Sequence, residues 1–186
     1  MNLPNKLTLI RVILVPFFVF FMLTDIVPAS PVIALAIFIV ASVTDALDGH
    51  IARSRNLVTT FGKFLDPLAD KVLVISALIC LNSLGVIGAV PVIIIVAREF
   101  MVSGLRLVTA NEGVVVAAGI WGKLKTAFTM VAEVAIMLGL CLGLEGSAAD
   151  IAYIIYQVLI WISTVLTIIS GAVYLKGYWK YIDASK

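Results

Sequence analysis

Four aspartates stand at helical spacing in an otherwise apolar sequence. Asp45 and Asp48 are three residues apart, and Asp66 and Asp70 are four residues apart. Residues at these spacings share one face of a helix, and the segment between the pairs is short, so antiparallel helices would bring the four carboxylates together. Four carboxylates do not stay ionised side by side unless cations neutralise them. Carboxylate oxygens at this density suit Mg²⁺ or Mn²⁺, and two such ions bridged by shared carboxylates serve phosphate chemistry.

Glycines and basic residues surround the aspartates. Gly49 and Gly62 lack a Cβ atom, so a phosphate or a nucleotide can approach the backbone there. Arg53 lies one turn beyond Gly49 on the same helical face, where a guanidinium can hold a diphosphate. The structural alternative to a metal centre is a set of ion pairs between the aspartates and Arg53, Lys63 and Lys71.

The composition indicates which kind of element carries these residues. Apolar residues make up 62% of the 186 residues and charged residues only 13%, whereas soluble domains are about 45–50% apolar and about 25% charged. These values exclude a soluble enzyme, a secreted disulfide scaffold and a coiled coil, so we expect an all-α integral membrane protein. The net charge of +2 gives no indication of nucleic acid binding. Cys80 and Cys141 lie in apolar runs and are expected to be packing residues rather than a disulfide.

Six apolar segments are long enough to span a bilayer, which takes about 20 residues. They cover residues 7–24, 31–50, 66–84, 88–108, 119–142 and 150–175. With the N-terminus inside, none of the 13 Lys and Arg residues falls in the outer loops, which carry Asp25, Glu145 and Asp150. This distribution predicts that both termini face the cytoplasm. We therefore expect one transmembrane domain over residues 1–186, without cleavage of the first segment, because Arg11 interrupts its apolar run.

The aspartates and glycines belong to one longer pattern. It reads Asp45-x2-Asp48-Gly49-x2-Ala52-Arg53-x8-Gly62-x3-Asp66-x3-Asp70, which is similar to the signature of the CDP-alcohol phosphotransferase family, with every fixed position met. The resemblance implies a six-helix transmembrane catalytic domain that pairs as a homodimer. It also implies a reaction in which a CDP-linked lipid donates its phosphatidyl group to an alcohol and releases CMP.

The resemblance implies a role for each residue of the pattern. The four aspartates would bind two divalent cations, Mg²⁺ or Mn²⁺, and Asp70 would also take the proton from the acceptor hydroxyl as the general base. Gly49, Arg53 and Gly62 would contact the CDP part of the donor. Thr59 could donate its hydroxyl to the same group.

Three cations outside the signature suit an anionic acceptor: Arg98, Arg106 and Lys123. Arg98 lies too deep in its apolar segment to be an interfacial residue, whereas Lys125 is expected to extend to the membrane surface. The aromatic tail that begins at Tyr174 is expected to be an interfacial anchor.

The segments around these cations resemble the bacterial branch of the family that uses sn-glycerol 3-phosphate. They are Ala97-Arg98-Glu99, Gly104-Leu105-Arg106 and Gly122-Lys123-Leu124-Lys125-Thr126. This resemblance implies that CDP-diacylglycerol and sn-glycerol 3-phosphate give phosphatidylglycerophosphate and CMP, in anionic phospholipid biosynthesis at a bacterial cell membrane, with the site facing the cytoplasm. The alternative within the family is another acceptor, such as inositol phosphate.

Two further points stay open from the sequence. Asn5 and Thr8, near Arg11, either line the donor side of the site or only begin the first membrane helix. A divalent-cation transporter is the alternative from another class, but transporters place their ion site near the midplane, and these carboxylates lie at one end. Glu133, inside the fifth segment, and His50, beside the signature, receive no role.

Overall fold

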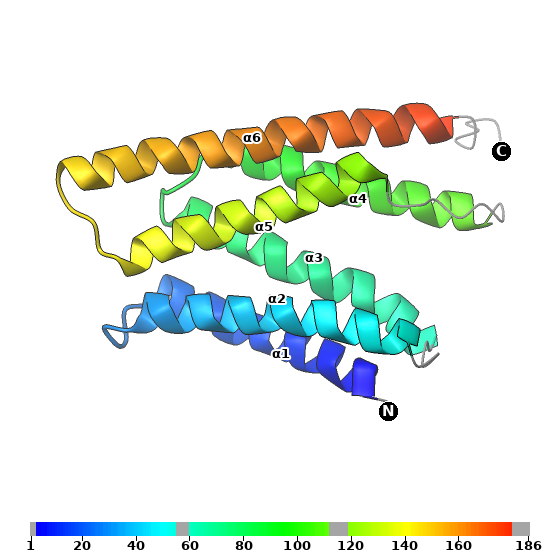
Figure 1. The fold of residues 1–186 in the computed structure, drawn as a ribbon, viewed down its shortest axis with the longest axis horizontal. Coiled ribbons are helices and arrows are strands. Elements are labelled where there is room, and N and C mark those ends of the chain that lie inside the picture. Colours follow the sequence, from blue (N-terminus) through cyan, green and yellow to red (C-terminus); the bar gives the residue numbers. More distant parts are fainter. Residues whose placement is uncertain (1–2, 55–59, 112–118, 180–186) are drawn as a thin grey trace.

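The computed structural model describes the backbone of residues 3–54, 60–111 and 119–179, which forms α-helices joined by turns (Figure 1). Side chains are described within these ranges except at 3–4, 45–54, 60–67, 70 and 110–111. Six helices follow one another along this part of the chain: α1 (Leu3–Leu23), α2 (Ser30–Ser54), α3 (Thr60–Ser83), α4 (Ala89–Asn111), α5 (Ile120–Cys141) and α6 (Ser147–Tyr178). The expectation of an all-helical fold with six helices is therefore confirmed for the described residues.

Helices α1, α2, α3, α4 and α6 extend beyond the apolar segments that predicted them, and α2 and α3 do so inside the signature. The second segment was expected to end at residue 50, but α2 continues to Ser54; the third was expected to begin at 66, but α3 begins at Thr60. The apolar segments were therefore ended inside the signature, whose middle part is polar. The backbone stays helical there because helical hydrogen bonds do not depend on side-chain polarity.

Successive helices run in alternating directions along the bundle (Figure 1). The end at which α1 begins and α6 ends is named the terminal end, and the end that holds the three short turns at 24–29, 84–88 and 142–146 is named the turn end. Helix α1 packs on α2 and α3, while α6 packs on α4 and α5. The last turns of α2 and the first turns of α3 both lie at the terminal end.

Three helices are long and apolar enough to cross a membrane, judged over the described residues alone: α1 from Asn5, α5 and α6. Shorter apolar stretches cover 30–44 of α2 and 71–83 of α3. Helix α4 carries Arg98, Glu99 and Arg106 within its length. The chain is a membrane protein with several apolar helices, and the crossing of all six stays a prediction.

Glycines in a left-handed backbone conformation make the sharp turns at the turn end. Gly85 has a φ of 72° at the end of α3, and the N–H of Val86 donates to the carbonyl of Leu81 at 3.0 Å. This backbone hydrogen bond closes the helix in the manner of a Schellman motif, in which glycine accepts the positive φ without strain. Gly143 and Gly146, with φ of 56° and 58°, reverse the chain between α5 and α6.

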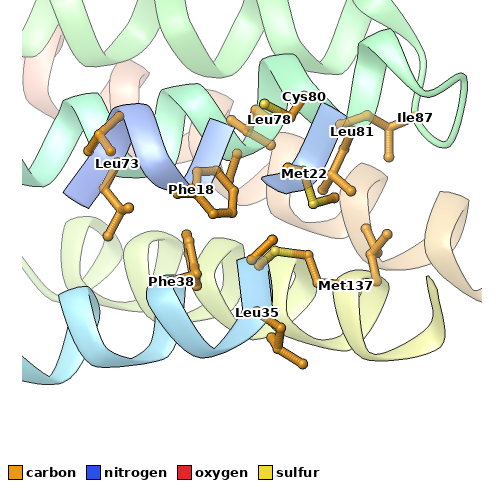
Figure 2. Close-up of a cluster of buried hydrophobic side chains, with 14 of the residues drawn as sticks. Phe18, Met22, Leu35, Phe38, Leu73, Leu78, Cys80, Leu81, Ile87 and Met137 are labelled. Atoms are coloured by element: carbon orange, nitrogen blue, oxygen red, sulfur yellow. The ribbon is translucent and has the colours of Figure 1, made fainter. Parts of the chain in front are cut away.

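The half of the bundle near the turn end is filled by apolar side chains from all six helices, and Figure 2 shows part of this cluster. The rings of Phe18 and Phe38 meet at a centroid distance of 5.7 Å, and Leu81 and Met137 pack in the same cluster. Cys80 is buried in this cluster as a free thiol and Cys141 is also free, which confirms the expectation that they are not paired.

Candidate active site

A cavity of about 670 Å³ occupies the half of the bundle near the terminal end. Every helix contributes to its lining, from Arg11 on α1 to Tyr174 on α6. Among the lining residues that the structure describes, six are basic and one is acidic: Arg11, Lys71, Arg98, Arg106, Lys123, Lys125 and Glu99. Low-dielectric walls strengthen the field of such a set, so the described wall of the cavity attracts anions.

The three cations predicted to hold an anionic acceptor all line this cavity. They differ in depth, because Arg98 is buried whereas Arg106 and Lys123 are exposed. Arg98 and Arg106 come from α4, and Lys123 comes from the first turn of α5. The cavity therefore has one deep cation of this set and two that reach it from more exposed positions.

Arg98 is held in place by two neighbours. One terminal nitrogen donates to the Ser170 hydroxyl on α6 at 2.5 Å, and the other donates to Glu99 Oε1 at 3.0 Å. Helix α6 comes close to α4 because residue 171 is glycine: a Cβ there would lie 3.1 Å from the Cγ of Arg98. The guanidinium is thus fixed from two helices before any ligand arrives.

Tyr174 was expected to be an interfacial anchor, and that expectation is wrong. Its side chain is buried, and its ring lies 5.5 Å from the guanidinium carbon of Arg98 and 5.7 Å from that of Arg106. Its hydroxyl accepts hydrogen bonds from Arg106 at 3.3 Å and from the backbone N–H of Gly119 at 3.0 Å. One aromatic ring therefore draws the two arginines together and ties them to the start of α5. An aromatic residue near a helix end suggests an interface, but the sequence does not reveal that this face of α6 packs on α4.

Lys125 was expected to extend to the membrane surface, and this is also wrong. Only 4% of the residue is exposed, and its ammonium group forms an ion pair with Glu99 Oε1, the same oxygen that Arg98 contacts. Lys125 belongs to the buried face of α5 together with Thr129 and Glu133. The spacing of this face was present in the sequence as residues 125, 129 and 133, and it was the signal that could have placed Lys125 inward.

A second polar link joins α3 to α4 at the cavity wall. Lys71 donates to the Ser103 hydroxyl, and that hydroxyl donates to the backbone carbonyl of Glu99 at 2.5 Å. Lys71 directly follows Asp70 in the sequence. Glu99, Ser103 and Arg106 recur at intervals of four and three along α4, so the sequence did indicate one polar helical face, although Glu99 and Ser103 were not chosen as site residues.

From the cavity toward the turn end, polar side chains continue between α5 and α6. Thr129, which lines the cavity, shares a hydrogen bond of 2.6 Å with Ser163. Glu133 lies one turn farther along α5, fully buried, and its two carboxylate oxygens have no hydrogen-bond partner within the described part of the chain.

The signature residues lie on the helices at the terminal end. Asp45 and Asp48 fall in the last three turns of α2, and Asp66 and Asp70 fall in the first three turns of α3. Their side chains lie outside the described residues, as do those of Arg53 and His50, the surroundings of Gly49 and Gly62, and Thr59 altogether. Elsewhere in the described chain, no group of His, Cys, Asp and Glu could hold a metal ion.

Asn5 and Thr8 are buried in the first turns of α1. Neither contributes to the cavity lining that is described, whereas Arg11, one turn farther along, does. The side chain of Arg11 is 1% exposed, so α1 turns a basic group inward at this level.

Comparison with known proteins identifies the family of the chain. Residues 1–169 match the model of the CDP-alcohol phosphatidyltransferase family, and the chain belongs to that family. It is 42% identical over 197 residues to the CDP-diacylglycerol–glycerol-3-phosphate 3-phosphatidyltransferase of Bacillus subtilis (strain 168), covering 99% of this chain and 98% of that protein.

Two further relatives carry the same name. The protein of Rickettsia bellii (strain RML369-C) is 39% identical over 180 residues, covering 97% of each chain. The protein of Haemophilus influenzae (strain ATCC 51907) is 40% identical over 181 residues, covering 94% of this chain and 92% of that protein. The similarity thus extends over nearly the whole chain.

Proposed function

We propose that this chain transfers the phosphatidyl group of CDP-diacylglycerol to sn-glycerol 3-phosphate, giving phosphatidylglycerophosphate and CMP. The observation that carries the proposal is the cavity at the terminal end, where six basic side chains and one acidic side chain line the described wall. An acceptor that brings its own phosphate suits this charge, whereas a neutral alcohol does not need it. The shared name of the full-length relatives supports the same substrates.

The acceptor phosphate is assigned to Arg98, Arg106 and Lys123. Arg98 and Arg106 are brought to one ring, that of Tyr174, and guanidinium groups bind phosphate oxygens through paired hydrogen bonds. Lys123 adds a cation from α5. The phosphate is held in the cavity, and the lipid chains of the donor stay in the bilayer.

The four signature aspartates are the residues that would hold two divalent cations, Mg²⁺ or Mn²⁺. Their donor chemistry fits, since four carboxylates stand on adjoining helices at one end of the bundle and hard divalent ions prefer oxygen ligands. When bound, such ions stabilise the negative charge that develops on the attacking and leaving oxygens.

The chain's own residues supply the remaining functions. Asp70 takes the proton of the attacking acceptor hydroxyl; that oxygen then bonds to the phosphorus of the phosphatidyl group, while the bond from this phosphorus to CMP breaks. Gly49, Arg53 and Gly62 receive the CDP part of the donor, and Thr59, Asn5 and Thr8 are assigned to the same side of the site.

All six helices cross the membrane as one domain, with the terminal end in the cytoplasm. The three turns at the turn end contain no Lys or Arg, and they carry Asp25 and Glu145, which agrees with the excess of basic residues on the cytoplasmic side of membrane proteins. The bacterial relatives support a bacterial cell membrane. The homodimer that the family resemblance implies is part of this proposal, and cross-linking in membranes tests it.

The experiment is CMP release by the purified protein in detergent, with CDP-diacylglycerol and either Mg²⁺ or Mn²⁺. The acceptors compared are sn-glycerol 3-phosphate, inositol phosphate, inositol and serine. We expect release with sn-glycerol 3-phosphate alone, and a loss of about 100-fold or more in Asp70→Asn, because general bases contribute about 10²–10⁴-fold.

Other outcomes separate the parts of the proposal. Release with inositol phosphate instead would keep the reaction and the base but overturn the acceptor. Release with none of the four would overturn the enzymatic proposal, and uptake of divalent cations into vesicles would then test transport.

A further inference from the structure

We infer that Glu99 recognises a hydroxyl group of the acceptor, and that it selects a polyol phosphate over a phosphate that lacks this hydroxyl. The inference rests on the proposed function and deepens it. Glu99 is the one acidic side chain in the described lining of a cavity that otherwise presents cations. A carboxylate repels a phosphate, so its presence inside an anion site calls for a separate partner.

The side chain of Glu99 is held in place before the acceptor binds. Arg98 and Lys125 both contact Oε1, and the side chain of Glu99 is 14% exposed. The backbone carbonyl of the same residue accepts the Ser103 hydroxyl. Two basic side chains therefore hold one carboxylate oxygen in place, and the neighbouring turn of α4 holds the backbone.

The second carboxylate oxygen remains for a ligand. An ionised carboxylate offers about four acceptor positions, yet both contacts of Glu99 end on Oε1, and Oε2 has no hydrogen-bond partner within the described part of the chain. Because Oε2 can only accept, its natural partner is a donor such as a hydroxyl group.

The position of Glu99 suits the middle of a short acceptor. It lies beside Arg98, which is assigned to the acceptor phosphate, and Ser103 connects it to Lys71, the residue after Asp70. An acceptor that extends from the arginines toward α3 at Asp70 passes along this face of α4. In sn-glycerol 3-phosphate, the carbon between the phosphate ester and the reacting hydroxyl carries a second hydroxyl, which does not react.

This contact makes the site selective in a way that cations alone do not. Arg98, Arg106 and Lys123 would accept any phosphomonoester of suitable size. A site with a buried group that hydrogen-bonds a substrate hydroxyl discriminates against the analogue without it, because the protein group is then left without its partner. The alternative role for Glu99 is only to neutralise Arg98 and Lys125.

The test compares sn-glycerol 3-phosphate with 3-hydroxypropyl phosphate, which has the phosphate and the reacting hydroxyl but lacks the middle hydroxyl. The ratio of their kcat/KM values is measured for the wild type and for Glu99→Ala. We expect a ratio of about 10 to 100 in the wild type, falling to near one in Glu99→Ala. Any general effect of freeing Arg98 and Lys125 acts on both acceptors and leaves the ratio unchanged.

Two variants serve as controls. Lys125→Met removes a partner of Glu99 but keeps the carboxylate, so both kcat/KM values fall while the ratio stays near that of the wild type. Glu99→Gln keeps an acceptor oxygen of similar reach, so its ratio is intermediate, and it replaces Glu99→Ala if that variant does not fold.

Two results would overturn the inference: a wild-type ratio near one, or a ratio that Glu99→Ala and Glu99→Gln leave unchanged. Failure of the proposed function looks different, because the wild type would then release no CMP with sn-glycerol 3-phosphate. In that case calorimetric binding of the same two phosphates, by the wild type and Glu99→Ala, decides the role of Glu99 by the same ratio.

Discussion

The same helices build both halves of the bundle, but one half is a packed apolar core and the other lines a basic cavity. Near the turn end, Phe18, Phe38 and Met137 pack into an apolar cluster. Near the terminal end, the continuation of these helices and their neighbours lines a cavity with six basic side chains in its described wall. Charges inside a membrane bundle are costly. Here the basic groups are stabilised by contacts with Glu99, Ser170 and Tyr174.

Helix α5 shows the contrast within one element. Ile136 and Met137 contribute to the apolar cluster, whereas Lys125 and Thr129, on the same buried face, belong to the cavity. This difference indicates that the half near the turn end stabilises the fold and that the half near the terminal end binds the substrate. A substitution in the apolar cluster should therefore lower the free energy of unfolding and leave substrate affinity unchanged. A substitution in the cavity should mainly lower substrate affinity.

The largest effect is expected from emptying the apolar half. Phe18→Ala removes a ring with no exposed surface that packs on Phe38. We expect the free energy of unfolding to fall by about 3 kcal/mol, at the low end for such a truncation, because moving an apolar side chain into detergent carries little transfer energy. Thermal unfolding in detergent measures this.

The matched control is the neighbouring residue on α1. Phe17 is 53% exposed, so Phe17→Ala leaves no internal cavity and should change the unfolding temperature little. Equal losses in the two variants would contradict the assignment of this half as the packed core.

A smaller effect is expected when a cation of the cavity is replaced, and it should differ between the deep Arg98 and the exposed Lys123. Arg98→Met removes a buried guanidinium, takes away the donor to the Ser170 hydroxyl and leaves Glu99 paired with Lys125 alone. We expect kcat/KM for sn-glycerol 3-phosphate to fall about 100-fold, and the KM for CDP-diacylglycerol to stay the same, because truncating a buried, hydrogen-bonded charge costs about 2–5 kcal/mol.

Lys123→Met is the comparison for that variant. Its side chain is exposed, and water screens such a charge, so the loss should be about 10-fold or less. A larger loss at Lys123 than at Arg98 would show that the phosphate sits at the exposed edge of the cavity instead of beside α6.

These expectations also show how far the sequence leads. The six helices follow from apolar runs of membrane length, and the family follows from the signature at Asp45–Asp70. Arg98 was identified as a site residue because a deep arginine in an apolar segment is rare without a function.

The supporting contacts did not follow from the sequence, because they depend on which helix faces which. Lys125 and Tyr174 both lie near helix ends, where interfacial positions are the rule. Only the packing of α6 on α4 and α5 turns them inward. The start of α3 at Thr60 was missed for a different reason, since hydrophobicity does not report a helix that continues through a polar segment.

An effect as small as that of Lys123→Met is expected at Tyr174. Tyr174→Leu removes the ring beside Arg98 and Arg106 and the hydroxyl that accepts from Gly119. We expect the KM for sn-glycerol 3-phosphate to rise about 10-fold with little change in kcat, because two cation–π contacts contribute about 0.5–1 kcal/mol each. Steady-state kinetics with varied acceptor measures this.

Tyr174→Phe sharpens the same comparison, since it keeps the ring and should restore most of the affinity. Tyr153→Leu, at a residue that is 51% exposed toward the other end of α6, should leave the acceptor KM at the wild-type value. A rise in the KM for CDP-diacylglycerol in Tyr174→Leu would show that the ring acts on the donor or on the fold.

The most direct measurement is the lipid product itself. The purified protein is incubated with CDP-diacylglycerol, sn-glycerol 3-phosphate and Mg²⁺, and the lipids are identified by mass spectrometry while CMP is counted. We predict phosphatidylglycerophosphate in equal amount to CMP, with both strongly reduced in Arg98→Met and reduced by about 100-fold or more in Asp70→Asn. CMP release that does not depend on sn-glycerol 3-phosphate, or a lipid with another head group, would contradict the account.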